Sequence, residues 1–521
     1  MKNLNEIIAN IPVSVTTDGP VEALEVTGIT LDSREVNPGF IFTALKGINQ
    51  DGHDYIDKAI EQGAVAILSN RTPEKSYAVP FLTVNNTREA LAYFAAAIED
   101  FPARDLIILG VTGTDGKTTT STILYHILKH AGFKVGLITT VSAIIGEKEL
   151  DTGFHVTTPE AVDVQKYLRM MADAGMTHIV LETTSHGLAQ HRVTGCEFDI
   201  GIVTNITHEH LDYHGSYDEY RAAKGRLFTE LTSPHKQTQT ISPVAILNKD
   251  DEGSFGYLQI ITKAKQYTYG IEDSEAVFNA VDVSHTPKGL SFAIQSDFGT
   301  AQINAHMIGH YNISNILAAF SAAVAGLGID PEIAAQGVST VPGVSGRMEV
   351  IDMGQTFTAI VDFAHTPNAL KVALETLKTI TNDKIWAVFG SAGLRDREKR
   401  SMMGAVSAQY SDYSVFTAED PRTESLDGIL EYMANAALEK GAVEGKTFWR
   451  IRDRGAAIQF AVDHAKPGDI VCAFGKGHEQ SMCFGTVEHH WDDRTAMKAA
   501  LAKHLGTDGP EMPYLPTQDE D

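Results

Sequence analysis

The chain has few cysteines, fewer basic than acidic residues and no long apolar run, and each of these shortages argues against a class of protein. Only three of the 521 residues are cysteines (Cys196, Cys472 and Cys483), which provide neither a disulfide framework nor the spacing of a metal site. No apolar stretch approaches the roughly eighteen residues of a membrane-spanning helix, and Met1–Ser14 does not resemble a signal peptide. We therefore expect a cytoplasmic protein without membrane insertion.

The charge balance also limits the partners. Lysine and arginine number 42 against 67 aspartates and glutamates, for a formal net charge of −25. Such an acidic chain is a poor candidate for binding nucleic acid or an anionic membrane, although a local basic pocket remains possible. Its length exceeds what a single hydrophobic core supports, so several domains are expected.

Short apolar runs alternate with helical patterns along the chain, which predicts an α/β fold with parallel sheets. A first, small α/β domain over 1–103 ends where Pro102 breaks a helical pattern. A central domain over 104–343 leads through the glycine-containing linker Val341–Gly346 to a third α/β domain over 344–505. The acidic, proline-containing residues 506–521 predict a disordered tail.

The most informative stretch runs from Leu106 to Thr119, where an apolar run ends in glycines and a helical pattern begins at Lys117. A strand, a glycine loop and a helix N-terminus in this order can cradle phosphate through backbone N–H groups. Lys117 would reach the outer phosphates, and the Thr118 hydroxyl would bind Mg²⁺. The spacing G-x-x-G-K-T is shorter than the general phosphate-loop motif, so a plain glycine turn before a helix remains an alternative at this point.

Polar residues follow neighbouring predicted strands at the edge where parallel strands end. Glu182 closes the strand His178–Glu182, and His208 and His210 follow the strand Phe198–Asn205. A lone strand-end carboxylate is usually a cap or a salt-bridge partner. Because these groups converge with the phosphate loop, they favour a shared magnesium site.

Lys224 is unusual because it lies on the apolar stripe of a predicted helix, with Tyr220, Ala223 and Leu227. The pattern alone leaves two interpretations open. The side chain either extends its ammonium into water, or it binds phosphate or is covalently modified.

Further polar blocks follow the predicted strands of the third domain. A basic cluster, Arg395–Arg400, is either a solvated face or a pocket for phosphate or carboxylate groups. The other groups near strand ends, the linker or a helix start are Asn312, Arg347, Asp362, His365, Asp420-Pro421-Arg422 and Gly475–Glu479.

In this order the blocks resemble the Mur ligase family of ATP-dependent amide-bond-forming enzymes, and within it the MurE branch. The resemblance covers nearly the whole chain. It rests on Leu31–Arg34, Pro38–Gly39, Thr112–Thr118, Val156–Glu160, Glu182–Leu188, Asn205–Asp212 and Ala223–Lys224, together with the third-domain blocks. It implies three domains that hold, in chain order, the UDP end of the substrate, ATP and the incoming amino acid.

The resemblance also implies roles for individual residues. The residues implied to bind ATP are Gly113, Thr114, Asp115, Gly116, Lys117, Thr118, Thr119, Asn312, Arg347 and Asp362. Those that contact the UDP-sugar-peptide are Ser33, Thr157, Thr158, Thr184, Gln190 and Arg192. Magnesium is held by Thr118, Glu182, His210 and Lys224, the last as a carbamate (N6-carboxylysine), and the catalytic set is Lys117, Glu182, His210 and Lys224.

The implied reaction is ATP-dependent addition of a dibasic amino acid to UDP-N-acetylmuramoyl-L-alanyl-D-glutamate through an acyl phosphate, in peptidoglycan precursor synthesis. We expect a monomer. The amino-acid contacts would be Arg395, Glu419, Asp420, Pro421, Arg422, Gly475 and Glu479. Members that use meso-diaminopimelate typically carry D-N-P-R, whose arginine binds the additional carboxylate, and G-K-G-H-E, whose glutamate meets an amine.

Here the second block is intact, but the first reads Glu419-Asp420-Pro421-Arg422. Arg422 favours diaminopimelate, whereas Asp420 could suit the terminal ammonium of L-lysine or L-ornithine. Val156 stands where an asparagine is common. The less favoured alternatives are a folylpolyglutamate-type or cyanophycin-type ligase and a scaffold that binds nucleotide without ligating.

Overall fold

The computed structural model describes residues 1–47, 50–73, 75–139, 143–150, 158–207, 211–231, 241–286 and 289–519. The chain has three successive α/β parts, which confirms the predicted fold class. Compactness divides it into two units. The first contains Met1–Asn279, Gln295–Gly299 and Asn315–Gly337, and the second contains Ala280–Ile294, Thr300–Ser314 and Val338–Asp521. Among the described residues, no helix is both long and apolar enough to cross a membrane.

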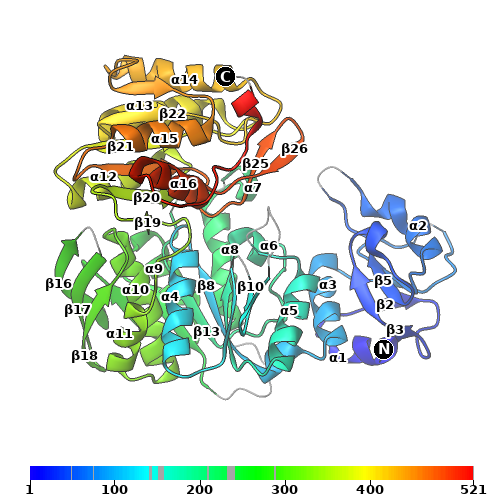
Figure 1. Cartoon of the computed structure of the whole chain (residues 1–521). Coiled ribbons are helices and arrows are strands. Elements are labelled where there is room, and N and C mark those ends of the chain that lie inside the picture. Colours follow the sequence, from blue (N-terminus) through cyan, green and yellow to red (C-terminus); the bar gives the residue numbers. More distant parts are fainter. Residues whose placement is uncertain are drawn as a thin grey trace. The chain divides into compact units, whose positions relative to one another are not determined.

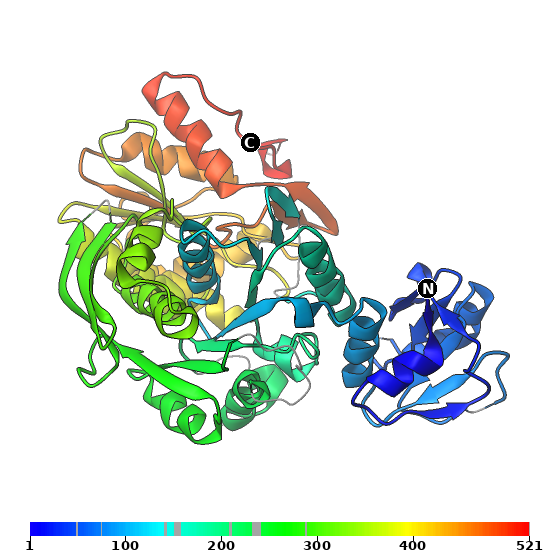
Figure 2. The same cartoon turned by 90° about the horizontal axis from the view of Figure 1, so that it is seen from below.

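The N-terminal part contains a five-stranded sheet in the order β2-β7-β6-β5-β4 (Figure 1, Figure 2, blue). Its elements are β1 (Lys2–Asn3), α1 (Leu4–Asn10), β2 (Thr16–Asp18), β3 (Glu25–Val26), β4 (Gly28–Thr30), η1 (Ser33–Glu35), β5 (Phe40–Thr43), η2 (Gly52–Tyr55), α2 (Ile56–Glu61), β6 (Ala66–Ser69), β7 (Phe81–Thr83) and α3 (Thr87–Ile98). Successive side chains of a strand point to opposite faces of the sheet, so this sheet packs against a hydrophobic core on each face. Ile41 and Leu68 pack in one core with residues of α1 and α3, and Phe42 and Ile67 pack in another with residues of α2.

The central part is a doubly wound sheet. Strands β9, β12, β8, β13, β14 and β15 are parallel and lie in that order, with β10 and β11 added antiparallel beyond β9. Its elements are η3 (Pro102–Asp105), β8 (Ile107–Thr112), α4 (Lys117–His130), β9 (Val135–Ile138), β10 (Ala143–Ile145), β11 (Lys148–Leu150), α5 (Ala161–Asp173), β12 (His178–Glu182), α6 (Ser185–Ala189), β13 (Ile200–Val203), α7 (Leu211–His214), α8 (Tyr217–Glu230), β14 (Val244–Asn248), α9 (Glu252–Ile261) and β15 (Lys265–Gly270).

Strand β16 (Phe278–Thr286) pairs in parallel with β15 at Phe278 and Asn279. The chain then forms β17 (Gly289–Ser296), β18 (Gly299–Ala305), α10 (Tyr311–Ser321), a π-helical turn η4 (Ala322–Gly326) and α11 (Pro331–Ser339). The aligned carboxyl ends of β8, β12, β13 and β14 are the positions where ligands gather in such sheets.

The third part has a six-stranded sheet in the order β19-β20-β24-β21-β22-β23, parallel except for β19. Its elements are β19 (Glu349–Ile351), β20 (Thr358–Asp362), α12 (Pro367–Ile380), β21 (Ile385–Phe389), α13 (Arg397–Tyr410), β22 (Tyr413–Phe416), α14 (Leu426–Glu439), β23 (Phe448–Arg450), α15 (Arg454–His464), β24 (Ile470–Phe474), β25 (Ser481–Phe484), β26 (Val487–His490), α16 (Asp493–Leu505) and η5 (Pro516–Asp519). Strands β20, β21 and β24 are almost fully buried.

The prediction of a disordered tail from residue 506 is wrong for residues 506–519. Leu515 is fully buried in the core of the third part, and the Thr517 hydroxyl donates to the Asp453 carboxylate over 2.9 Å. The acidic and proline content suggested disorder, but Met512 and Leu515 supply apolar anchors that fix the segment to the domain.

Candidate active site

The phosphate loop joins β8 to α4 and requires glycine at two positions. Gly113 and Gly116 have φ values of +153° and +80°. A Cβ at Gly113 would collide with the Thr204 hydroxyl, and one at Gly116 with the Asn315 side chain. Two elements therefore pack directly against the loop backbone, which accounts for both glycines.

The loop is held by its neighbours. The Thr207 N–H donates to the Thr114 hydroxyl over 2.9 Å, and the Asp115 N–H donates to the Asn205 Oδ1 over 3.0 Å. The Lys117 ammonium folds back to the Thr114 carbonyl at 2.8 Å. The N-cap residue of α4 is Gly116, which has no side chain to cap the helix, so the first N–H groups and the positive dipole end of the helix are suited to an anion. Thr119 is buried in the first turn of this helix.

The predicted metal ligands Thr118 and Glu182 lie together. The Thr118 hydroxyl donates to the Glu182 Oε2 over 2.9 Å, because β8 and β12 are adjacent parallel strands with Val111 opposite Glu182. Hard oxygen donors of this kind fit Mg²⁺. The described part of the chain contains no group of three or more His, Cys, Asp or Glu side chains that could hold a metal ion, and His208 and His210 lie outside it.

Lys224 is buried, with a relative exposure of 2%, so its place on the inward face of α8 is confirmed. Its ammonium donates to the Gly113 carbonyl, on the phosphate loop itself, and lies 4.6 Å from the centre of the Tyr220 ring. This arrangement excludes the interpretation in which the side chain extends into water.

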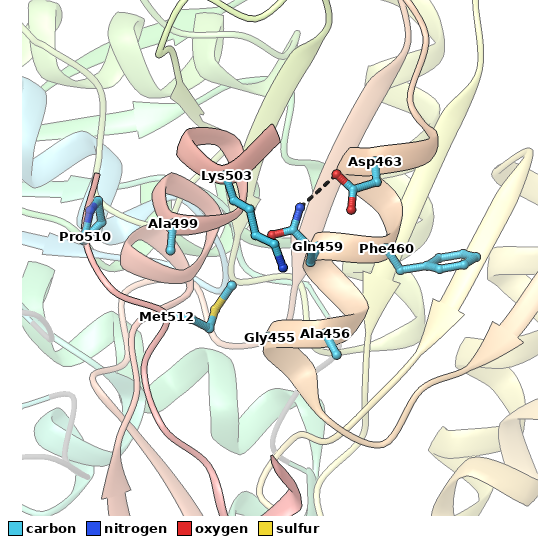
Figure 3. Close-up of a pocket in the computed structure, with 9 residues that line it drawn as sticks. All are labelled: Gly455, Ala456, Gln459, Phe460, Asp463, Ala499, Lys503, Pro510 and Met512. Atoms are coloured by element: carbon cyan, nitrogen blue, oxygen red, sulfur yellow. Dashed lines mark hydrogen bonds between the residues drawn. The ribbon is translucent and has the colours of Figure 1, made fainter. Parts of the chain in front are cut away.

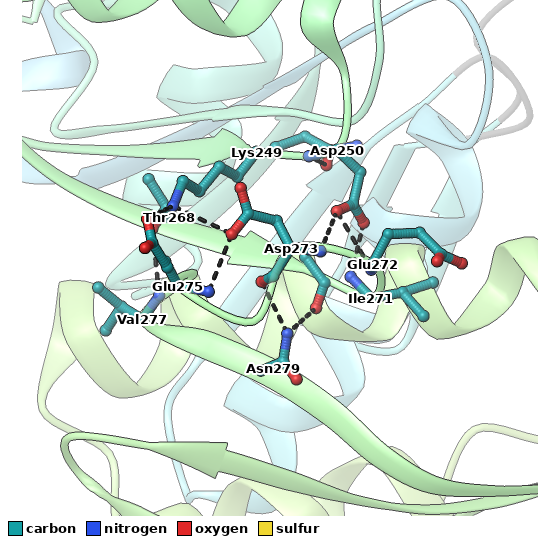
Figure 4. Close-up of polar contacts among 11 residues, drawn as sticks. Lys249, Asp250, Thr268, Ile271, Glu272, Asp273, Glu275, Val277 and Asn279 are labelled. Atoms are coloured by element: carbon teal, nitrogen blue, oxygen red, sulfur yellow. Dashed lines mark hydrogen bonds and ion pairs between the residues drawn. The ribbon is translucent and has the colours of Figure 1, made fainter.

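Residues at and directly after the carboxyl end of β14 hold the loops that follow β13 and β15. Asn248 donates to the Thr204 carbonyl over 2.6 Å, and Asp251 accepts from the Ile206 N–H over 2.7 Å. Figure 4 shows that Asp250 in turn holds the loop after β15 by accepting three consecutive N–H groups, those of residues 271–273, at 2.6–3.2 Å. The sequence analysis did not identify this support, although three polar residues directly after β14 were a signal of it.

The predicted UDP-substrate residues form a second polar group in the first unit. The Thr158 and Thr184 hydroxyls lie 3.0 Å apart, and Thr184 caps α6. Arg192 donates to the Thr158 carbonyl over 2.7 Å and to Gln190 over 2.9 Å, and it pairs with Glu160 at 2.8 Å. Burial is the main cause that lowers the pKa of Arg192, against the carboxylate of Glu160.

Three predicted contacts of this group need separate mention. Ser33 is buried in η1 of the N-terminal part. Thr157 and Val156 lie outside the described residues. The sequence analysis missed Tyr213, whose hydroxyl accepts from Gln190 over 3.0 Å and whose ring centre lies 4.1 Å from that of His186.

The predicted nucleotide residues of the second unit are fixed by backbone contacts. Burial raises the pKa of Asp362, which accepts the N–H groups of Met348 and Ala364, each at 2.8 Å. The guanidinium carbon of Arg347 lies 4.5 Å from the centre of the Phe363 ring, and Asn312 donates to the Ile308 carbonyl over 2.7 Å.

Two of the predicted amino-acid residues of the third part, Asp420 and Glu479, contact Lys476. Its ammonium lies 3.1 Å from Asp420 and 2.7 Å from Glu479. Burial disfavours the charge of Lys476, but Glu479 and Asp420 outweigh it and raise the pKa. The sequence analysis named this lysine only as part of a block.

Two neighbouring groups are buried without hydrogen-bond partners among the described residues, Glu419 Oε2 and Arg422 Nε. Burial raises the pKa of Glu419 against the attraction of Lys399 and Arg454. Gly475 packs against Glu419, since a Cβ there would lie 2.9 Å from Oε2. Pro421 is buried, and Arg395 is exposed in the loop before α13.

A pocket of about 490 Å³ lies elsewhere in the third part, between α15, α16 and the C-terminal segment (Figure 3). None of the predicted site residues lines it. Gln459 and Lys503 supply polar groups, and Pro510 and Met512 close one side.

Comparisons with known proteins match all three parts. Family models match as "Mur ligase family, catalytic domain" over residues 25–99, "Mur ligase middle domain" over 111–323 and "Mur ligase, glutamate ligase domain" over 346–477.

Relatives and a solved structure cover nearly the full length. A protein of Roseiflexus sp. (strain RS-1), named UDP-N-acetylmuramyl-tripeptide synthetase, is 41% identical over 93% of this chain and 96% of its own. A UDP-N-acetylmuramoyl-L-alanyl-D-glutamate–2,6-diaminopimelate ligase of Geobacillus thermodenitrificans (strain NG80-2) is 39% identical over 92% and 95%. A solved structure of a ligase with the same name is 29% identical, with a TM-score of 0.69, over 96% of this chain and 99% of that one.

Proposed function

Because the chain belongs to the Mur ligase family of ATP-dependent ligases, we propose that it joins meso-2,6-diaminopimelate to UDP-N-acetylmuramoyl-L-alanyl-D-glutamate during peptidoglycan precursor synthesis. The names of the relatives that match over nine-tenths of the chain support this substrate. The observation that carries it is Arg422, whose buried Nε has no hydrogen-bond partner in the described structure. A buried guanidinium donor needs an acceptor, and the additional carboxylate of diaminopimelate supplies one.

The first chemical step transfers the γ-phosphoryl group of ATP to the side-chain carboxylate of the D-glutamate, which forms an acyl phosphate and ADP. Lys117 and the uncapped N-terminus of α4 offset the negative charge of the phosphates. Asn312, Arg347 and Asp362 are the proposed nucleotide contacts in the second unit. The amine of the amino acid then attacks the acyl carbon, and phosphate leaves from the tetrahedral intermediate. No side-chain nucleophile is required.

The proposed magnesium ligands are Thr118, Glu182, His210 and Lys224 as a carbamate. When bound, magnesium neutralises charge on the transferred phosphoryl group. The Thr118–Glu182 pair supplies oxygen donors. Lys224 would add another, because its neutral amine joins CO₂ through a new N–C bond and loses a proton. Conversion to a carboxylate-like group also explains why a lysine is buried against the phosphate loop.

The UDP-sugar-peptide would be held by Ser33, Thr157, Thr158, Thr184, Gln190 and Arg192. Arg192 connects the described residues of this group, since it contacts Thr158, Gln190 and Glu160. We expect the enzyme to act in the cytoplasm, where its three unbridged cysteines stay reduced, and to be a monomer, which sedimentation would test.

A lysine- or ornithine-adding enzyme is the second candidate, and the observation that favours it is the carboxylate of Asp420. That carboxylate already accepts hydrogen bonds from Lys476 and from the Cys483 N–H, at 3.1 and 2.9 Å. Its charge is therefore partly compensated within the protein, which weakens the case for a second ammonium there.

The test is phosphate release with ATP, Mg²⁺ and UDP-N-acetylmuramoyl-L-alanyl-D-glutamate, with meso-diaminopimelate, L-lysine or L-ornithine added separately. Release that depends on diaminopimelate and is at least about tenfold faster than with the other two supports the proposal. Preference for lysine or ornithine would select the second candidate, and no release with any of the three would reject both.

A further inference from the structure

The block Glu419–Arg422 follows β22 in an unusual backbone conformation. Asp420 and Arg422 have φ values of 40° and 55°, in the left-handed region that non-glycine residues rarely adopt. Arg422 exchanges backbone hydrogen bonds with the β25–β26 hairpin, its N–H donating to Cys483 and its carbonyl accepting from Gly485, at 3.0 and 2.8 Å. This network fixes the directions in which the Asp420 and Arg422 side chains leave the backbone.

Fixed in this way, Asp420 meets Lys476. One oxygen of Asp420, Oδ1, accepts from both the Lys476 ammonium and the Cys483 N–H. Lys476 is 1% exposed and also pairs with Glu479, so a single buried cation lies between two carboxylates. The buried Glu419 carboxyl, whose Oε2 has no hydrogen-bond partner among the described residues, adds a third acidic group to the same neighbourhood.

The charge of this pocket bears on which amino acid it accepts. Diaminopimelate carries a second carboxylate that L-lysine lacks, so a more negative pocket disfavours diaminopimelate and favours lysine. Interactions between charges a few ångströms apart are strong where water is excluded. Lys476 directly contacts Asp420 and offsets its charge, with Arg454 contributing at longer range; without Lys476, Asp420 would repel the distal carboxylate from Arg422.

We propose that Lys476 is a specificity-determining residue that neutralises Asp420 and thereby lets Arg422 select an amino acid with a distal carboxylate. The inference rests on the proposed function. It assigns Lys476 a role exerted through Asp420, so its effect must disappear when Asp420 no longer carries a charge.

The experiment is a double-mutant cycle of K476M and D420N, with kcat/KM measured for meso-diaminopimelate and for L-lysine. We expect K476M to lower the diaminopimelate-to-lysine preference at least about tenfold, a change of about 1.4 kcal/mol. D420N alone should not lower the preference, because it removes the charge that Lys476 offsets, and the double variant should recover most of what K476M loses.

The matched control is K384M, because Lys384 also forms a lysine–aspartate pair in the third part, with Asp412 over 2.8 Å. Lys384 directly precedes β21, whereas the predicted site residues follow the carboxyl ends of strands. K384M should leave the preference unchanged. Circular dichroism and thermal unfolding establish that each variant is folded before its kinetics are compared.

Three outcomes would overturn the inference while the proposed function stands, provided that the wild type uses diaminopimelate. These are an unchanged preference in K476M, a double variant no better than K476M, and a D420N enzyme whose preference for diaminopimelate falls fivefold or more. The last would mean that Asp420 contacts the substrate directly, and it decides the question even if K476M fails to fold. A wild type that uses none of the amino acids would instead reject the proposed function.

Discussion

The Thr118 hydroxyl donates a hydrogen bond to the Glu182 carboxylate over 2.9 Å, although the two residues lie 64 positions apart in the chain. The contact arises because β8 and β12 are neighbouring parallel strands in register, so the residues that follow β8 and end β12 share one edge of the sheet. A hydroxyl and a carboxylate are thus prepositioned beside the phosphate loop. Oxygen ligands of this kind suit the metal ion that phosphoryl transfer uses.

T118V and E182Q should each reduce phosphate release by about 10²-fold or more, because each removes an oxygen ligand from the proposed magnesium site. The measurement is kcat as a function of Mg²⁺ concentration, which should show weaker apparent magnesium binding in both variants. T122V is the control, since Thr122 lies one turn further along α4 and bonds only to the Thr118 carbonyl in the described structure. Equal losses in T122V and T118V would contradict the assignment.

K224R and K224M should both lose at least about 10²-fold in activity, because neither side chain can form a carbamate. The wild type should also lose activity in CO₂-free buffer and regain it when bicarbonate is added, whereas K224R should not respond. Mass spectrometry under mild conditions should find one added CO₂ on the wild type alone. An active K224R enzyme that ignores bicarbonate would rule the carbamate out.

The sequence predicted strands well where a fully buried apolar run ends in a polar residue. Strand His178–Glu182 has its predicted bounds, and burial over its full length explains the clear signal, whereas the predicted strand Phe198–Asn205 is a strand only over Ile200–Val203. Local patterns also placed Lys224 on an inward helix face. They could not show that its partner is the Gly113 carbonyl, because that contact spans 111 positions.

The third part shows the same division. The predicted strand ends correctly grouped Asp420 with Gly475–Glu479 on one rim. The position of Lys476 between Asp420 and Glu479 depends on the left-handed backbone at Asp420. Glycine usually indicates such a backbone in a sequence, and this position carries an aspartate instead. The C-terminal segment was misjudged for a related reason, since its burial comes from a few apolar anchors in a polar stretch.

H478Q should make the protein less sensitive to acid. Burial, with the nearby Arg347 and Arg494, lowers the pKa of His478 to about 3, so the folded state favours neutral histidine. The stability from this residue is therefore fully present above about pH 6.5 and is lost as pH falls from there toward 3, by at most about 1.4 kcal/mol per pH unit. Thermal unfolding midpoints at pH 7, 6 and 5 should fall more steeply for the wild type than for H478Q. H490Q, at an exposed histidine, should behave as the wild type; identical slopes in all three proteins would refute the prediction.

D250A should lower the free energy of unfolding by about 2 kcal/mol or more, because the Asp250 carboxylate accepts three backbone N–H groups that would lose a charged acceptor. Denaturant unfolding of the purified protein measures the change. E272A, which removes an exposed side chain from the same loop, is the control and should stay within about 0.5 kcal/mol of the wild type. A D250A protein as stable as E272A would mean that the loop does not depend on this carboxylate.

L515A should destabilise the third part by about 2–5 kcal/mol, because Leu515 is fully buried and its truncation leaves a cavity in the domain core. T517V should cost about 1 kcal/mol through the lost hydrogen bond to Asp453. E511A changes an exposed residue of the same segment and should have no effect. Denaturant unfolding of the full-length variants separates these three values. If the segment contributed nothing to stability, L515A would match E511A. Asp453 also caps α15, and Arg454 in that helix donates to the Ala418 and Phe474 carbonyls. We therefore expect L515A also to raise KM for the amino acid, while KM for ATP stays constant.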